Sequence, residues 1–375
     1  MNMVKRLAVW IGLTVAAAVF WIFVDSTAGL AALILILAVP AAAILVMLLA
    51  GRSFVVNISA PESCTEGDGI NCEIKLERAP KLCNISAEVA ISNIHTGDES
   101  VVNIELDKGK AVLEITPEFC GATELIVRNL ILSDAFGITG RSILSGHKAK
   151  TAVMPKLCEM NIGITQQSFA MPDSDEYSAV RPGYDSSEIF GIREYIPGDN
   201  IKSIHWKLSQ KTGNTMVREY SLPVINQVLL MLDIPKGASS QEINTLTEVF
   251  SSLTASLTNA GIAHQLAWLD YKNSGKISCD VKTEEDFSEA LDLLLNQPPN
   301  TSIVSESELL CARGGFAHVV YVGRDCSGKL TDSFNGSRVN ALLLNSAQTG
   351  VTNDGYYIMG FTEKNWRDIL NTFEI

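Results

Sequence analysis

The stretch from Phe190 to Tyr220 reads FGIREYIPGDNIKSIHWKLSQKTGNTMVREY, and packing alone would not select many of its residues. It carries five basic side chains against three acidic ones, in a chain whose formal net charge is −13. A locally basic segment in an acidic protein is expected to attract an acidic partner. The basic residues are Arg193, Lys202, Lys207, Lys211 and Arg218, and the acidic residues are Glu194, Asp199 and Glu219.

A tight turn is predicted at the middle of this stretch. Pro197 presets the first central torsion of a turn, and Gly198 can adopt the positive φ that a type II turn needs next. Asp199 is placed to cap the helix that follows. That helix is predicted from about Asn200 to Gln210, because apolar residues recur there at helical spacing, and Gly213 is expected to end it.

Strands are predicted on both sides of the turn and helix, over Ile189 to Tyr195 and Thr215 to Tyr220. If the two strands lie in one sheet, their charged side chains can form cross-strand pairs. The same charges could instead form a docking face for an acidic partner, with Trp206 or Tyr195 as its aromatic anchor. The sequence leaves both interpretations open.

The stretch resembles the signature of the domain-of-unknown-function 58 family, whose bacterial and archaeal members are often encoded beside MoxR-type ATPases. The resemblance is dense here and extends more loosely over the second half of the chain. Because the chemistry of this family is not established, the resemblance implies a fold and a setting rather than a reaction. The signature residues that we take as the candidate partner-binding site are Arg193, Glu194, Tyr195, Pro197, Gly198, Asp199, His205, Trp206, Lys207, Arg218 and Glu219.

Two apolar runs without a charge precede the rest of the chain, Leu7 to Val24 and Leu30 to Ala50. Each is near the ~20 residues that cross a bilayer as a helix, so we predict two transmembrane helices. The alternatives are a signal peptide followed by an anchor, or a hairpin buried in a protein core. Cations flank the pair at Lys5, Arg6 and Arg52 and are absent between the runs, which predicts that both ends face the cytoplasm at the cell membrane.

The chain contains eight cysteines, none in a CxxC pair and none near a histidine at zinc-finger spacing, so no metal site is predicted from them. In the cytoplasm they would be reduced. If the membrane orientation is reversed, the four cysteines between Cys64 and Cys120 could form disulfides.

Short alternating runs broken by turn residues fill Ser53 to Pro155 and predict a small antiparallel sandwich. Within it, Asp134-Ala135-Phe136-Gly137-Ile138 resembles an element that precedes the signature in the family, although a turn with a buried Phe would look the same. The predicted strands are Phe54 to Ser59, Asn71 to Leu76, Ser86 to Ser92, Val101 to Leu106, Ala111 to Ile115 and Glu124 to Ile131.

The segment from Met171 to Glu188 is polar and acidic and contains two prolines and a glycine, which predicts an exposed loop. Such a charge cluster is usually only solvated. A sharper hypothesis is that this acidic cluster folds against the basic signature when no partner is bound. Its members are Asp173, Asp175, Glu176, Asp185 and Glu188.

After Leu222 buried apolar strands alternate with amphipathic helices, a pattern typical of a parallel, doubly wound sheet. The family resemblance makes this region similar to a von Willebrand factor A domain. The predicted strands are Val228 to Asp233, His264 to Leu269, Phe316 to Val322 and Val339 to Leu344, and the predicted helices are Gln241 to Asn259, Glu284 to Asn296 and Glu363 to Phe373.

In the von Willebrand fold an Asp-x-Ser-x-Ser motif commonly holds a metal at the end of the first strand. Here Asp233 is in place, but the next four residues offer no hydroxyl, Lys236 adds a positive charge, and Ser239 falls too late. We therefore predict no metal site, and we expect local backbone donors to satisfy Asp233.

No phosphate-binding loop, dinucleotide-binding loop or serine-hydrolase motif is present. His205 is the one histidine in a motif, and with Glu194 and Asp199 it could form an acid–base group of a membrane-surface enzyme such as a hydrolase. The alternative is that Trp206 anchors the helix by burial while His205 caps it. Nucleic acid is an unfavourable partner for so acidic a chain.

These observations together predict an α+β protein of four segments. They are a transmembrane hairpin at residues 1–52, an immunoglobulin-like β-sandwich at 53–155, the signature segment at 156–221 and a von Willebrand factor A-like α/β domain at 222–375. We expect a membrane-anchored, cytoplasm-facing interaction or scaffold protein without a cofactor. By the family resemblance its partners are a MoxR-type AAA+ ATPase and other membrane or envelope proteins, with a role in assembling or maturing cell-envelope or membrane complexes.

Overall fold

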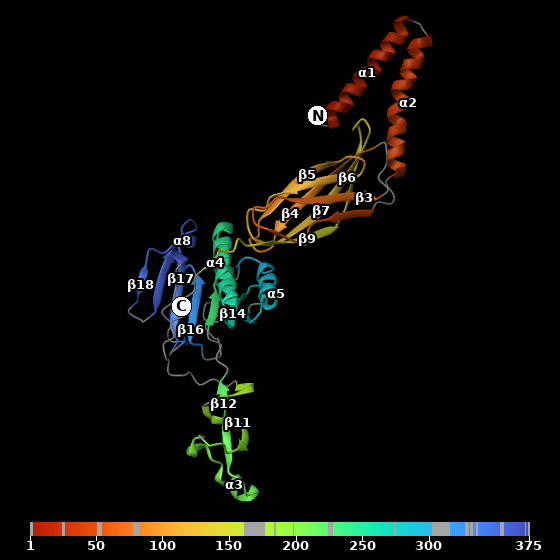
Figure 1. Ribbon diagram of the computed structural model, residues 1–375. Coiled ribbons are helices and arrows are strands. Elements are labelled where there is room, and N and C mark those ends of the chain that lie inside the picture. Colours follow the sequence, from red (N-terminus) through yellow and green to blue (C-terminus); the bar gives the residue numbers. More distant parts are fainter. Residues whose placement is uncertain are drawn as a thin grey trace. The chain divides into compact units, whose positions relative to one another are not determined.

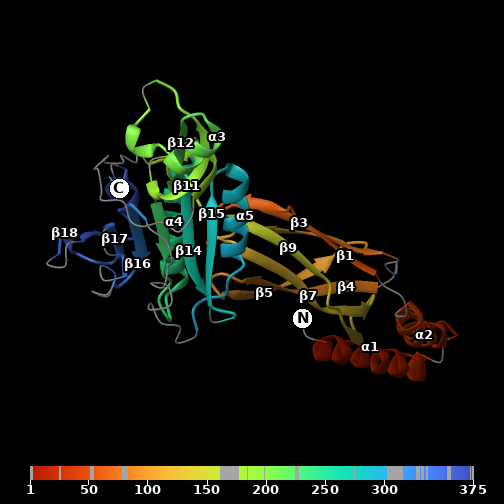
Figure 2. The same ribbon diagram turned by 90° about the horizontal axis from the view of Figure 1, so that it is seen from below.

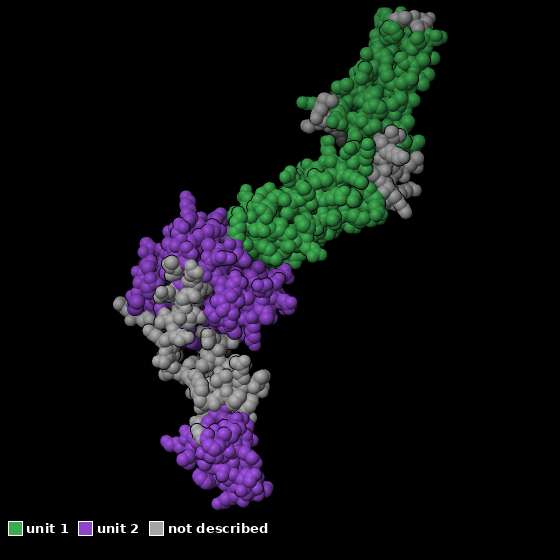
Figure 3. All heavy atoms as spheres, viewed as in Figure 1, with its two compact units in different colours: residues 1–156, 294–298 green, residues 157–293, 299–375 purple. Residues whose placement is uncertain are grey.

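The computed structural model is shown from two directions in Figure 1 and Figure 2. It describes residues 3–24, 27–50, 55–77, 83–160, 177–183, 185–197, 199–223, 228–273, 275–301, 316–326, 330, 333–334, 337–352, 356–371 and 373. Predictions that concern Arg52, Asp173 to Glu176, Gly198 and Cys311 therefore lie outside the described residues. The chain divides into two compact units, residues 1–156 with 294–298 and residues 157–293 with 299–375 (Figure 3).

Two long helices open the first unit, α1 (Met3–Val24) and α2 (Thr27–Ala50). By length and composition both can cross a membrane, with mean hydropathies of 1.9 over Lys5–Phe23 and 2.9 over Thr27–Leu48. Only 0% and 6% of these windows are buried inside the protein, unlike the core helix of a soluble protein. A signal sequence near an N-terminus passes the same test of length and hydropathy.

An antiparallel β region completes the first unit. Its smaller sheet has the order β1-β3-β6, and its larger sheet has the order β2-β9-β7-β4-β5 with β8 beside β7. Every strand pair in these sheets is antiparallel except β2 with β9. The strands are β1 (Val55–Ser59), β2 (Ser63–Thr65), β3 (Ile70–Glu77), β4 (Cys83–Asn93), β5 (Glu99–Leu106), β6 (Lys110–Ile115), β7 (Gly121–Asp134), β8 (Gly140–Leu144) and β9 (Lys148–Met154).

The two sheets share one hydrophobic core. Ile74 of β3, Val89 of β4 and Leu125 of β7 are fully buried in the same cluster of apolar side chains. The alternation that predicted strands over Ser53 to Pro155 is visible in β3, whose side chains alternate between buried and more exposed positions. The sequence did not predict β2, β8 and β9, because they are short or rich in lysine and exist through pairing with distant strands.

The second unit begins with the signature sheet, whose order is β10-β12-β11. Its strands are β10 (Tyr177–Gly183), β11 (Asp185–Glu194) and β12 (Met216–Pro223), all antiparallel. The prediction of an exposed loop through Glu188 is therefore wrong from Tyr177 onward. The polar side chains of this segment hide its strand character, because β12 supplies hydrogen bonds that composition cannot reveal.

A mixed, mostly parallel α/β sheet forms the rest of the second unit, with the order β15-β14-β13-β16-β17-β19-β18. Only its outermost pairs, β14 with β15 and β18 with β19, are antiparallel. The strands are β13 (Val228–Leu232), β14 (His264–Asp270), β15 (Gly275–Val281), β16 (His318–Gly323), β17 (Arg338–Leu344), β18 (Thr349–Val351) and β19 (Tyr357–Phe361).

Three helices of the α/β region are described, α4 (Ser240–Asn259), α5 (Glu284–Leu295) and α8 (Trp366–Leu370). Helix α4 packs against β13 and β16 through the apolar face that the sequence predicted. The prediction of a helix from Glu363 to Phe373 is too long. Residues 363–365 form a turn instead, in which the Asn365 side chain accepts a hydrogen bond from the Thr362 amide at 2.7 Å.

Candidate functional site

The signature segment folds around the predicted turn. The Asp199 amide donates to the Ile196 carbonyl at 3.0 Å, which closes a four-residue turn containing Pro197. The Tyr195 amide donates to the Thr215 carbonyl at 2.8 Å and so joins the start of the turn to the strand that returns. A turn at this position is confirmed, and the two flanking strands lie in one sheet, which is the condition for cross-strand charge pairs.

The prediction that Asp199 caps the following helix is wrong. Asn200 is the cap, because its side chain accepts from the Lys202 amide at the start of the short 3₁₀ helix η1 (Ile201–Ser203). The Asp199 carboxylate turns back into the turn and accepts from the Ile196 amide at 2.8 Å. Its second partner is a cation from the preceding strand.

That cation is Arg193, which links the turn to both strands. Its Nη1 and Nη2 donate to the two carboxylate oxygens of Asp199 at 2.7 Å each, and its Nε donates to Glu219 at 2.8 Å. The hydrogen bonds from Arg193 and the Ile196 amide lower the pKa of Asp199 to about 2. The bonds to Asp199 and Glu219 raise the pKa of Arg193. A bidentate pair of this kind fixes geometry as well as charge.

A β-bulge in β11 decides which side chains share a face. Ile189 lies opposite Tyr220 and Gly191 lies opposite Glu219. Between these two pairs β11 therefore contains one residue more than β12. Arg193, opposite Val217, therefore faces the same side as Glu219, as their ion pair requires. The other face of the pair carries Ile189 and Ile192, together with Glu194 and Arg218.

The predicted helix from Asn200 to Gln210 is in fact two shorter helices, η1 and α3 (Trp206–Thr212). Between them Ile204 adopts an extended conformation and bridges to Val217 of β12. The His205 side chain is the N-cap of α3 and accepts from the Leu208 amide at 3.3 Å. Gly213 ends the helix in the left-handed region with φ 77°, as predicted.

Trp206 does not anchor the helix by burial, which corrects that prediction. Its side chain is 64% exposed, because α3 begins at this residue and contacts β12 with other positions. Among the described residues outside α1 and α2, exposed large apolar side chains are most numerous in this part of the chain. Those of the signature segment are Ile189, Ile192, Tyr195, Ile196, Ile201 and Trp206.

Exposed lysines accompany these apolar side chains. Lys202, Lys207 and Lys211 are exposed, and none takes part in an ion pair between residues that the structure describes. Arg193 in contrast is committed to Asp199 and Glu219. The basic character that the sequence predicted is therefore carried by the lysines. We call the six exposed apolar residues and the three lysines the signature surface.

The residues of the enzymatic alternative have separate partners. The ring of His205 is engaged with the Leu208 amide, Glu194 accepts from the Asn214 side chain at 2.8 Å, and Asp199 is held by Arg193. No hydrogen bond between described residues links these three side chains to one another. This arrangement gives the acid–base hypothesis no geometric support.

Asp233 lies directly after β13, at the carboxyl edge of the α/β sheet. The hydroxyl of Tyr321, from the neighbouring strand β16, lies 2.7 Å from its Oδ2, so its partners include a side chain that the sequence prediction did not foresee. Ser239 serves as the N-cap of α4 and accepts from the Glu242 amide at 3.2 Å. Among the described residues there is no group of three or more His, Cys, Asp or Glu side chains that could hold a metal.

Two solved structures are weakly similar to part of this chain. The CARDB domain of the PF1109 protein from Pyrococcus furiosus, in complex with di-metal ions, is 15% identical over 27% of this chain and 88% of that chain, with a TM-score of 0.16. The Pseudomonas fluorescens alkylpurine DNA glycosylase AlkC, bound to DNA with an abasic site analog, is 14% identical over 28% of this chain and 32% of that chain, with a TM-score of 0.18. Neither score supports an argument about fold or function.

Comparison with curated proteins finds no match. A family model does match, and it covers the signature segment together with the first part of the α/β region. The family is described as "Protein of unknown function DUF58", and the match runs from residue 191 in β11 to residue 288 in α5. Residues 191–288 of this chain belong to the DUF58 family.

Proposed function

We propose that this protein is a membrane-anchored docking protein that binds an acidic protein partner through the signature surface. The observation that carries the proposal is the exposure of Trp206 and Ile201, at 64% and 67%, next to lysines that no described carboxylate neutralises. A few side chains, often tryptophan, contribute most of the binding energy when a partner covers them. Free lysines select a partner of opposite charge and accelerate its association.

The membrane anchor in this proposal is the pair α1 and α2. Lys5 and Arg6 stand at the start of α1, and Thr27–Gly29 at the start of α2 carries no cation, so both outer ends of the pair face the cytoplasm. The β region that follows is an immunoglobulin-like sandwich, supported by its two sheets around one core. The mostly parallel sheet supports a von Willebrand factor A-like domain after it.

The partner that the family resemblance suggests is a MoxR-type AAA+ ATPase. In this role the protein would present the ATPase to membrane or envelope complexes that are being assembled or matured. Because the anchor holds this protein at the membrane, it meets other membrane-bound components by diffusion within one surface. This confinement favours their binding to each other. The resemblance carries this identification, and the exposed signature surface supplies a place for the contact.

A binding experiment tests the proposal directly. The full chain in lipid nanodiscs is titrated with the MoxR-type ATPase encoded nearest to it, and binding is measured by surface plasmon resonance. We expect Trp206→Ala to weaken binding by about 2 kcal/mol, or roughly 30-fold in Kd. Leu293→Ala is the matched control, because Leu293 is 49% exposed and lies on α5 outside the signature surface.

Absence of binding by the unmodified chain would reject the ATPase as partner. Equal binding by the Trp206 and Leu293 variants would reject the signature surface as the contact. Arg193 is not a suitable site for this test, because its loss would also disturb the turn through Asp199. A hydrolytic activity that disappears in His205→Gln would instead favour the enzymatic alternative.

A further inference from the structure

The element Asp134-Ala135-Phe136-Gly137-Ile138 forms a turn between β7 and β8 that one buried carboxylate organises. The Asp134 carboxylate accepts from the Phe136 amide at 2.8 Å and from the Thr139 amide at 2.5 Å. Burial alone would raise the pKa of Asp134, but these hydrogen bonds outweigh burial and lower the pKa, so the group stays ionised. The turn, residues 134–139, is thus held by hydrogen bonds within itself.

One face of α1 lies against this turn. The rings of Trp10 and Phe136 meet edge to face with their centroids 5.0 Å apart. Arg6, one helical turn before Trp10, lies over Gly137, whose missing side chain leaves room for the guanidinium. Arg6 and Trp10 are half-buried, whereas the residues between them are exposed, as expected for a helix face in contact.

The second helix meets the same turn. Met47, near the end of α2, is buried in the core cluster of the β region. Its sulfur lies 3.9 Å from the Thr139 hydroxyl. Both helices therefore reach the turn with the ends that lie opposite the connection between them.

The position of Trp10 along α1 indicates the depth of the turn. If Lys5 and Arg6 lie among the lipid headgroups, Trp10 lies about 6 Å further along the helix axis, at a rise of 1.5 Å per residue. The polar region on each side of a bilayer is itself about 5–8 Å thick. Trp10 then lies at the boundary with the hydrocarbon, the depth that tryptophan prefers. Phe136 lies at the same depth, because its ring touches that of Trp10.

We infer that the turn at residues 134–139 enters the membrane interface, where Phe136 contacts both Trp10 and lipid. Through these contacts the turn holds the helix pair against the β region. This inference rests on the membrane anchoring that we propose.

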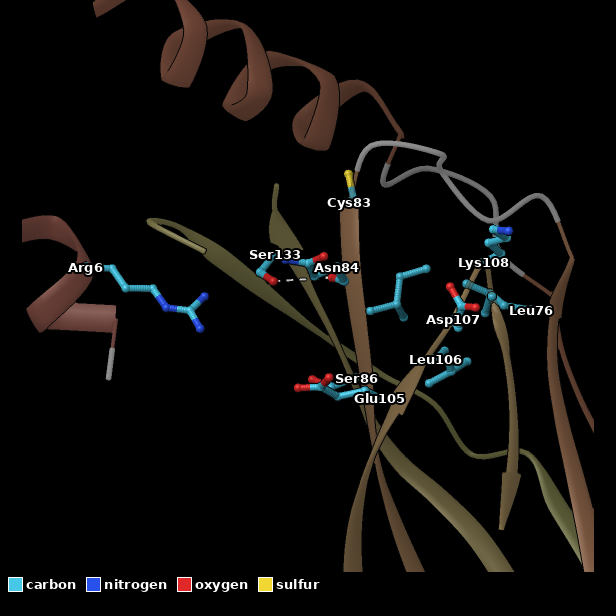
Figure 4. Close-up of a pocket in the computed structure, with 12 residues that line it drawn as sticks. Arg6, Leu76, Cys83, Asn84, Ser86, Glu105, Leu106, Asp107, Lys108 and Ser133 are labelled. Atoms are coloured by element: carbon cyan, nitrogen blue, oxygen red, sulfur yellow. Dashed lines mark hydrogen bonds between the residues drawn. The ribbon is translucent and has the colours of Figure 1, made fainter. Parts of the chain in front are cut away.

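An open groove of about 1040 Å³ lies on the same side of the β region, lined by Arg6, Lys108 and Asp107 among others. Figure 4 shows Arg6 reaching from α1 on one side of this groove, opposite Asp107 and Lys108.

Photo-crosslinking of the full chain in phosphatidylcholine liposomes tests the inference. p-Benzoylphenylalanine replaces Phe136 in one variant and Val101 in the other. Val101 is the matched control, because it is apolar, 46% exposed and lies on β5 rather than in the turn. It lies five residues before Leu106, which lines the groove. We expect adducts of position 136 with lipid and with the peptide that contains Trp10, and no lipid adduct at position 101.

An adduct with the Trp10 peptide alone would overturn the inference, because the turn would then contact the helices outside the bilayer. Lipid adducts at both positions, or no adduct at position 136, would overturn it as well. Carbonate extraction of the unmodified chain separates these results from a failure of the proposed function. A chain that leaves the membrane at high pH is not anchored by α1 and α2, whatever the crosslinks show.

Discussion

The guanidinium of Arg193 and the carboxylate of Asp199 form two parallel hydrogen bonds of 2.7 Å across the turn of the signature segment. Arg193 also holds Glu219 of the returning strand. One side chain therefore connects the outgoing strand, the turn and the returning strand. Signature residues that are widely separated along the chain act here as a single structural unit, on which the exposed apolar side chains are displayed.

Asp199→Asn should loosen this turn without unfolding the sheet. The substitution keeps the shape of the side chain but removes the charge that pairs with Arg193. We expect amide hydrogen exchange at Ile196 and Tyr195 to become roughly 3- to 10-fold faster, because the turn opens locally. Exchange in β13, which is fully buried, should not change. Unchanged exchange at Ile196 would contradict the proposed role of the ion pair.

Exposed lysines should govern how fast an acidic partner associates. Replacing Lys202, Lys207 and Lys211 together by glutamate reverses the local charge of the signature surface while leaving Trp206 in place. We expect the association rate to fall by about tenfold or more at low ionic strength, with a smaller change at high salt. Lys282→Glu, Lys272→Glu and Lys236→Glu together form the control, since they make the same change of net charge elsewhere. An equal effect of both triple variants would contradict a role for these particular lysines.

The buried histidine of the first unit predicts a dependence of stability on pH. His95 is fully buried with Nδ1 3.1 Å from the Gln297 carbonyl, and burial lowers its pKa to about 4 despite that hydrogen bond. Between pH 6.5 and 4 the unfolded chain binds a proton that the folded chain does not. Stability should therefore fall as the pH drops through this range, by at most about 3 kcal/mol.

The measurement is the free energy of opening from native-state hydrogen exchange in β4 and β7, at several pH values. His95→Gln cannot titrate, and its opening free energy should lose this part of the pH dependence. Other groups that titrate in the same range remain in both proteins. The difference in opening free energy between the unmodified chain and His95→Gln therefore reports the contribution of His95. Identical pH profiles would show that His95 does not carry the effect.

Gly213 should tolerate substitution less well than Gly191, the glycine of β11. It ends α3 with φ 77°, where an L-residue other than asparagine is strained. We expect Gly213→Ala to cost about 1 kcal/mol of local stability and Gly213→Asn to cost less. Gly191→Ala is the control, because an added Cβ would lie 3.7 Å from the nearest Glu219 oxygen in ordinary contact. Hydrogen exchange in α3 and β12 reports the difference.

Elements with a continuous apolar run or a clear period could be predicted from the sequence. The continuous apolar runs become α1, α2 and the strand β13, and the apolar repeat at helical spacing becomes α4. Gly213 and the turn at Pro197 could be predicted as well, because their conformations depend on a few adjacent residues. Short strands such as β2 and β18 could not, since three residues carry too little periodicity.

The candidate site was predicted in its residues but not in their roles. Asp199 and Asn200 are both good caps, and only the position of Arg193 on β11 directs Asp199 into the turn while Asn200 caps η1. Trp206 would be buried on most helices, yet α3 begins at that residue and presents it to solvent. Local sequence preferences allowed either residue to cap η1, and they allowed Trp206 to be buried or exposed.

The sequence by itself determined the order of the segments, the apolar hairpin, the family to which residues 191–288 belong and the local surplus of positive charge. Only the tertiary structure decided which charges are neutralised and which side chains are exposed. The physical reason is strand register: the bulge after Ile189 brings Arg193 to the side of Glu219, so that Arg193 and not a lysine pairs with this carboxylate. Register depends on contacts between strands far apart in the chain, which no local pattern encodes.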